Sequence, residues 1–157
     1  MARLIKKILI ALLFLMLPGI CFASWTISAN ITRGADYNDG TKLHEIVISA
    51  TSDGSDPAEF NLSTYLTSAQ MDRIKGGFFY QVVTDPGTEP DDTYTLAFDN
   101  DLGGNILDLS GLSVTATEIH DAAADLGFFP IIFDLQIDIG DIGSASDSIT
   151  IYIDIIK

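Results

Sequence analysis

The chain has 157 residues, of which 8 are Lys or Arg and 22 are Asp or Glu, so its formal charge is −14. Hydrophobic residues make up 47%, which excludes the acidic disordered chains, because those chains are poor in hydrophobic residues. The composition suits a folded domain with an acidic surface. The charge also argues against binding to nucleic acid, since phosphates require clustered Lys and Arg side chains.

The first 23 residues have the three parts of a secretory signal peptide. A basic start is followed by an apolar run of ten, Ile8 to Leu17, and by small residues at positions −3 and −1 before a cleavage point after Ala23. A retained anchor is the alternative, but the run is shorter than the roughly 20 residues that span a bilayer. Lipidation of Cys21 is disfavoured, because Ile20 stands where lipoproteins carry a small residue.

We therefore predict a signal peptide over 1–23 and a single domain over 24–157. Cleavage leaves five basic residues against 22 acidic ones, a formal charge of −17, and removes the only cysteine. The mature chain then has no disulfide, and its size allows it to bury about two thirds of its surface without one. We expect the product to be secreted, periplasmic or at the cell surface, with no membrane segment, or to be part of a virion.

Apolar and polar side chains alternate along most of the mature chain, beginning with Trp25, Ile27, Ala29 and Ile31. This period is typical of half-buried strands. We predict strands over residues 25–32, 43–51, 60–62, 78–84, 94–98, 106–109, 112–116, 133–139 and 149–155, and turns or loops over 33–42, 52–57, 85–87, 89–92, 99–105 and 141–147.

Two short helices interrupt the strands in this prediction. Thr67 and Gln70 have the spacing of a capping box before a helix over 68–75, and Gly76-Gly77 would end it. Apolar residues at helical spacing predict a second helix over 117–127. Since some of the nine segments are only short candidates, we expect about seven or eight strands. With the frequent turns they indicate an all-β fold, an antiparallel β-sandwich of the jelly-roll or immunoglobulin-like type. Aromatic side chains at 78–80 and 94 are expected in its core.

The acidic turn at 99–105 is a candidate calcium site, because Ca²⁺ takes six to eight oxygen ligands. The candidate ligands are Asp99, Asp101, Asn105 and Asp108. The pattern departs from an EF-hand at Gly103 and Ser110, and a solvated hairpin turn is the simpler explanation, since Asp, Asn and Gly are common turn residues. Apart from this possible calcium, we expect no cofactor.

No other pattern points to catalysis. The two histidines, His44 and His120, have no spacing typical of a zinc site, and the chain has no Gly-x-Ser-x-Gly sequence. Paired carboxylates for glycoside hydrolysis are defined by their separation in space, which the sequence leaves open. We therefore expect a protein that is not an enzyme.

The middle of the chain resembles a recurrent small β-sandwich protein of bacteriophage and prophage genomes. The resemblance rests on Gly77–Gly87, Pro90–Leu96, the turn at Asp99 and the final hairpin over 131–155, and covers about residues 43–155. It implies a virion-associated or surface-displayed structural protein with no catalytic residues. The predicted leader departs from that pattern, because phage particles assemble in the cytoplasm, and an exported bacterial relative is the alternative.

These observations lead to one functional hypothesis and one alternative. The first is a non-enzymatic exported or virion-associated protein that acts through contacts with a protein partner or with itself. Such contacts can form where strand edges pair across subunits. The strand that starts at Trp25 is a candidate, because it would begin at the new N-terminus and could be donated to another subunit. The alternative is a cell-surface module that binds calcium or carbohydrate.

Overall fold

The computed structural model describes residues 25–36, 40–54, 58–87, 93–100, 104–121, 130–132, 134–140 and 142–157. The predicted leader lies outside these residues, as do most of the predicted helix over 117–127 and Asp101. Over the described residues no helix is both long and apolar enough to cross a membrane.

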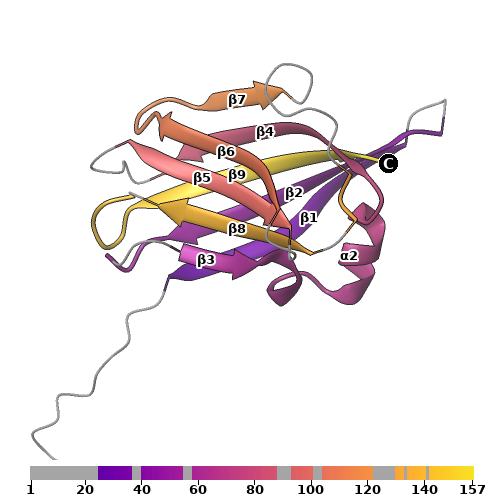
Figure 1. Cartoon of the computed structure of the whole chain (residues 1–157), viewed down its shortest axis with the longest axis horizontal. Coiled ribbons are helices and arrows are strands. Elements are labelled where there is room, and N and C mark those ends of the chain that lie inside the picture. Colours follow the sequence, from indigo (N-terminus) through magenta and orange to yellow (C-terminus); the bar gives the residue numbers. More distant parts are fainter. Residues whose placement is uncertain are drawn as a thin grey trace, which may run out of the picture.

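Within the described residues, nine strands form two antiparallel sheets (Figure 1). The five-stranded sheet has the order β1-β2-β9-β4-β7, with bounds β1 (Thr26–Asp36), β2 (Lys42–Thr51), β9 (Ser148–Ile156), β4 (Phe78–Pro86) and β7 (Glu118–Asp121). The four-stranded sheet has the order β3-β8-β5-β6, with bounds β3 (Ala58–Asn61), β8 (Leu135–Gly140), β5 (Tyr94–Asn100) and β6 (Asn105–Leu112). The predicted antiparallel β-sandwich is therefore confirmed.

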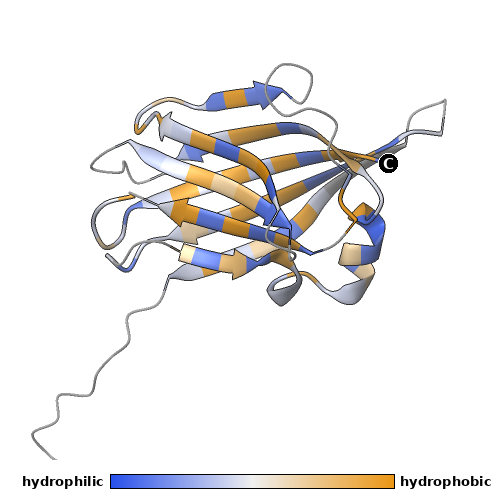
Figure 2. Ribbon diagram, in the orientation of Figure 1, coloured by the Kyte–Doolittle hydropathy of each residue, from blue (hydrophilic) through white to orange (hydrophobic). Residues whose placement is uncertain are grey.

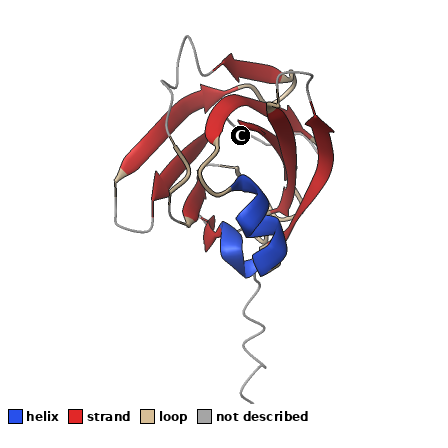
Figure 3. Cartoon of the chain, turned by 90° about the vertical axis from the view of Figure 1, so that its right-hand side faces the viewer, coloured by secondary structure: helices blue, strands red, loops and turns tan. Residues whose placement is uncertain are grey.

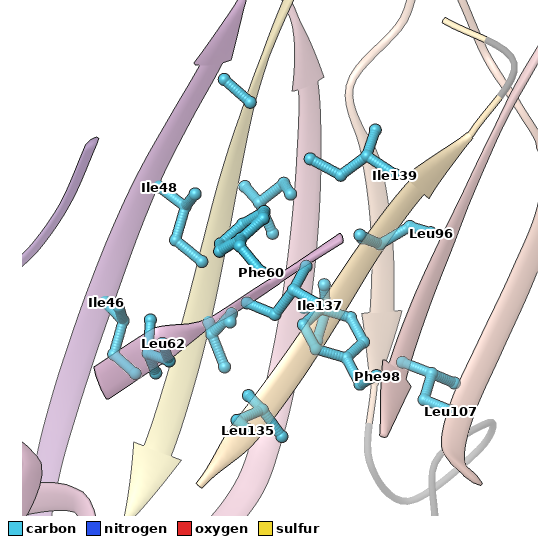
Figure 4. Packing of buried hydrophobic residues seen from close by; sticks show 14 of the residues in the cluster. Ile46, Ile48, Phe60, Leu62, Leu96, Phe98, Leu107, Leu135, Ile137 and Ile139 are labelled. Carbon is cyan, nitrogen blue, oxygen red and sulfur yellow. The ribbon is translucent and has the colours of Figure 1, made fainter. Parts of the chain in front are cut away.

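The alternating side chains explain why the two sheets pack together. Apolar and polar residues follow each other along the strands (Figure 2), and the two sheets lie face to face (Figure 3). In β2, β5, β8 and β9 the buried residues are the alternating apolar ones. Ile46 and Ile48 of the five-stranded sheet and Leu96 and Ile137 of the four-stranded sheet are fully buried in one cluster (Figure 4). Burial of these aliphatic side chains is the main force that holds the sheets together.

The predicted first helix is confirmed as α2 (Ser68–Ile74), which follows a 3-10 turn over Leu62–Thr64. Thr67 and Gln70 form the expected capping box, in which the backbone N–H of each residue donates to the side chain of the other. Gly76 has a φ of +81°, which L residues with a Cβ rarely adopt, and this turn ends the helix. Helix α2 lies at the end of the sandwich where β9 finishes (Figure 1).

The predicted helix over 117–127 is wrong where it is described, because residues 118–121 form β7. Residues 81–84 of β4 pair with this segment in antiparallel register, with Val82 opposite His120 and Val83 opposite Ile119. Helical spacing is a local signal, whereas the hydrogen-bonding edge of β4 is supplied by residues about 40 positions earlier in the chain. The pairing with that edge overrides the local preference.

Three further details differ from the sequence predictions. Strand β1 continues to Asp36 through a bulge after Ile31, so the loop expected over 33–42 is shorter. The separate strand expected over 112–116 is wrong: β6 runs from Asn105 to Leu112 and ends there. The Ser113 hydroxyl accepts hydrogen bonds from the N–H groups of residues 115 and 116 and turns the chain. Phe79 and Tyr94 are buried as expected, but Phe78 and Tyr80 are 42% and 48% exposed, because they lie on the outer side of β4 at a bulge.

Candidate functional site

The structure brings together part of the predicted calcium site. Asp99 and Asn105 are cross-strand partners in the hairpin of β5 and β6, and Asp108 is exposed on β6 opposite Ala97. Asn100 closes the turn, because its side chain accepts from the Gly104 N–H at 3.0 Å. Among the described residues no group of three or more His, Cys, Asp or Glu is arranged to hold a metal ion. Since Asp101 is outside them, calcium binding stays a prediction.

The outer face of the four-stranded sheet is acidic. The register places Glu59, Asp138, Ala97 and Asp108 side by side across β3, β8, β5 and β6. Burial raises the pKa of Asp138 above its usual 3.8, and the neighbouring carboxylates of Glu59 and Asp99 raise it further. Gln136 donates a hydrogen bond to Glu59, which neutralises no charge. The face therefore repels further anions and disfavours close contact with an acidic partner.

We expect Asp138→Asn to raise the melting temperature at pH 7. The raised pKa means that the folded state holds the Asp138 proton more tightly than the unfolded state, so ionisation at neutral pH costs stability. Stability due to this group is therefore lost as the pH rises from 3.8 through the folded-state pKa. Thermal unfolding from pH 3 to 7 measures the effect, and the gain should vanish at the acid end. The control is Asp108→Asn on the same face, and an equal gain in both variants would contradict this account.

Several polar side chains meet on the inner side of the sandwich next to β7. Tyr94 and Thr84 are both fully buried, and His120 Nε2 lies 3.7 Å from Glu118 Oε2. The Thr84 hydroxyl is close enough to lower the pKa of Tyr94 slightly. Neither hydroxyl, however, has a partner in hydrogen-bond geometry among the described residues. Burial dominates and raises the pKa of Tyr94 above 10.0, helped by the carboxylates of Glu118 and Asp85. A group held in its neutral form in this way is a poor general base at neutral pH.

The edge of the five-stranded sheet at β1 is the feature most suited to a contact with another protein. Lys42 and Lys157 exchange two backbone hydrogen bonds of 2.8 Å. This pair shows which residues of β2 direct their backbone groups to β9. Because backbone groups in an antiparallel ladder alternate between the two neighbouring strands, odd-numbered residues of β2 bond to β1. Residues 28 and 30 of β1 therefore bond to β2, and residues 27, 29 and 31 direct their N–H and C=O groups to the free edge.

The inner side of β1 is only partly covered. Trp25, Ile27, Ala29 and Ile31 are half-buried against the core, whereas the inner residues of neighbouring β2, such as Ile46, are fully buried. The facing sheet ends at β3, which has four residues against eleven in β1 (Figure 1). The free edge thus has two components: a row of backbone groups with no neighbouring strand among the described residues, and an apolar strip beside it.

Sequence reasoning found the first strand but not its place at a sheet edge. Strand order depends on pairings between distant residues, such as Ile31 with Ile46 and Ile46 with Ile153, and no local pattern encodes them. The structure agrees with the predicted position of one histidine and not with that of the other. His44 lies in β2 as expected, whereas His120 is in a strand rather than on a helix.

The sequence matches no protein-family model and no curated protein. Among solved structures it is similar to the Tobacco streak virus coat protein, with 12% identity, a TM-score of 0.38, and coverage of 91% of this chain and 90% of that one. It is also similar to the virus-like particle of Macrobrachium rosenbergii extra small virus (13%, TM-score 0.35, 81% and 84%) and to the xylan binding module CBM86 from Roseburia intestinalis (13%, TM-score 0.30, 85% and 93%). These values describe a loose likeness of β architecture, from which no property of this chain follows.

Proposed function

We propose that this protein is a non-enzymatic, exported or virion-associated structural protein that binds a protein partner, or another copy of itself, by strand addition at β1. The observation that carries the proposal is the free edge of β1, with its outward backbone groups at residues 27, 29 and 31 and the half-buried apolar strip beside them. An added strand would satisfy the backbone groups and cover the strip at the same time.

The edge carries few of the features that protect strands from such pairing. Natural edge strands are usually short or carry Lys, Pro or inward-pointing charges. Residues 26–31 of β1 (Thr-Ile-Ser-Ala-Asn-Ile) contain no charged residue and no proline, and the bulge comes only after Ile31. One side-chain contact reaches this stretch from helix α2, where Gln70 Nε2 donates to Asn30 Oδ1 at 2.8 Å. That bond involves side chains only, and no strand of the described residues pairs with the outward backbone groups of Ala29 and Ile27.

The charge of the chain is consistent with selective rather than general association. With 22 acidic and 8 basic residues, copies of the molecule repel one another at long range. Pairing must therefore come from a surface on which apolar and backbone contacts outweigh the repulsion. The β1 edge is such a surface, because its residues 26–31 carry no charge.

The test is a substitution that removes one edge donor and leaves the β1–β2 ladder intact. We expect Ala29→Pro to weaken association at least tenfold, because the missing N–H belongs to the free edge and not to the ladder with β2. Ala29→Val is the matched control: it keeps the N–H and should associate like the original chain. The exported protein and both variants are compared by sedimentation velocity over a range of concentrations, with far-ultraviolet circular dichroism to verify the fold.

Strand addition itself is tested with a synthetic peptide of residues 25–36, which represents the β1 strand of a second copy. This peptide should bind the original chain and the Val variant but not the Pro variant. Equal behaviour of the Pro and Val variants in both measurements would contradict the proposal. So would an original chain that stays monomeric and binds no strand peptide.

A further inference from the structure

The few cations of this acidic chain gather at one end of the sandwich. Outside the predicted leader there are five Lys or Arg residues, and four of them lie at this end: Lys42 at the start of β2, Arg73 on α2, Lys75 just after it, and Lys157 just after β9. Among the described residues at this end, Asp36 on β1 pairs with Lys42 and Asp72 lies on α2. The basic residues are thus concentrated here on a chain whose total formal charge is strongly negative.

Three of these cations line one cavity. Lys42, Arg73 and Lys157, together with His44 and Gly40, surround a volume of about 350 Å³. Lys42 and His44 lie on the side of β2 that continues from the buried Ile46 and Ile48, so the cavity is at the mouth of the sandwich, beyond its core. Helix α2 provides the opposite wall, and it is held there by a 2.9 Å hydrogen bond from Lys157 Nζ to the backbone carbonyl of Asp72.

The positions of Lys42 and Lys157 cost the fold stability when no anion is bound between them. Lys42 and Lys157 exchange backbone hydrogen bonds, so they are directly opposite each other and project from the same face of the sheet. Like charges in this position destabilise a sheet. The Asp72 carbonyl binds the Lys157 ammonium without cancelling its charge. Among the described residues no carboxylate lies within 4.0 Å of the charged groups of Lys42, Arg73 or Lys157.

We propose that this cavity binds a compact multivalent oxyanion, a phosphate or sulfate group. Three basic residues from three separate segments line it, and Arg73 carries the planar fork that pairs with two oxygens of such a group. A bound dianion would neutralise both opposed lysines, which nothing else described at this site does. The concave shape favours a small protruding group over the flat face of a protein. This site is separate from the β1 edge and its test does not depend on association.

The experiment measures binding of inorganic phosphate to the exported protein. Isothermal titration and thermal unfolding are carried out with phosphate and with sodium chloride at equal ionic strength. We expect phosphate, but not chloride, to raise the melting temperature. Lys42→Gln and Arg73→Gln should each weaken phosphate binding at least tenfold. Lys75→Gln is the matched control, because Lys75 belongs to the same end of the molecule but does not line this cavity.

A second readout separates binding from a structural role of the lysine. In phosphate-free buffer Lys42→Gln should be at least as stable as the original chain, because one of two opposed charges is gone, and yet phosphate should no longer stabilise it. Equal effects of phosphate and chloride, or an equal loss of binding in Lys75→Gln, would overturn the proposal. If the protein cosediments with phosphatidylglycerol vesicles but not with phosphatidylcholine vesicles, the bound phosphate belongs to a lipid headgroup. If it binds free phosphate but does not cosediment with phosphatidylglycerol vesicles, the phosphate comes from a soluble molecule.

Discussion

Phe98→Ala is expected to lower the free energy of unfolding by about 3–5 kcal/mol. Phe98 of β5 is fully buried and packs edge to face against Phe79 of β4, with 5.7 Å between ring centroids and an interplanar angle of 64°. The contact joins the two sheets, so truncation removes apolar burial from both and leaves a cavity where they meet. Urea unfolding followed by circular dichroism measures the loss.

Two comparisons make this prediction specific. Phe98→Leu keeps most of the buried volume and should cost much less than the alanine variant. A double-variant cycle with Phe79→Leu should give a coupling of about 0.5–1.5 kcal/mol, the usual value for an aromatic pair. A loss below about 1 kcal/mol for Phe98→Ala would contradict the packing of the two sheets described here, since surface substitutions rarely exceed about 0.5 kcal/mol.

Tyr94→Phe is expected to raise the free energy of unfolding by about 1 kcal/mol, and Thr84→Val should act in the same direction. Both hydroxyls are fully buried, one from each sheet, and neither has a partner with hydrogen-bond geometry. Burial of an unpaired hydroxyl costs about 1–3 kcal/mol, so its removal at constant shape should be favourable. The opposite result, two destabilised single variants and a double variant restored to the original stability, would show that the hydroxyls bind each other.

The pH dependence offers an independent measurement of the same site. Burial raises the pKa of Tyr94 above 10.0, so above pH 10 the unfolded state loses this proton while the folded state keeps it. The stability of the original chain should therefore fall more steeply above pH 10 than that of Tyr94→Phe. Urea midpoints between pH 8 and 11 give the difference, and parallel curves for the two proteins would contradict a buried, neutral Tyr94.

The amphipathic strands could be predicted because their signal is local. The hairpin expected over 131–155 is wrong, because its two strands, β8 and β9, pair with other strands and lie in different sheets. Within each of them, however, Ile137 and Ile151 alternate with Asp138 and Tyr152, and this period by itself decides which side of the strand is buried. The capping box at Thr67 is local in the same sense, since its two partners are three residues apart. Period and capping thus predicted most of the strands and one of the two expected helices, and from the strands the antiparallel sandwich.

The candidate sites could not be predicted in the same way, because they depend on residues that are distant in sequence. Residues 118–121 have the apolar spacing of a helix, yet they form a strand that pairs with β4. Phe78 and Tyr80 have the side chains of core residues, yet they lie on the outer side of β4 next to its bulge and are exposed. Lys42, Arg73 and Lys157 are isolated charges in the sequence, and only the pairing of β2 with β9 and the position of α2 make them neighbours.

The sequence by itself determined the layered β architecture and the acidic surface of this protein, since side-chain alternation and composition act at every position independently of the rest of the chain. Only the tertiary structure decided which strand stands at an edge and which charges share a cavity. The physical reason is that strand order comes from hydrogen bonds and packing between segments that are up to about a hundred residues apart, such as β2 and β9, and a local pattern contains no information about such partners.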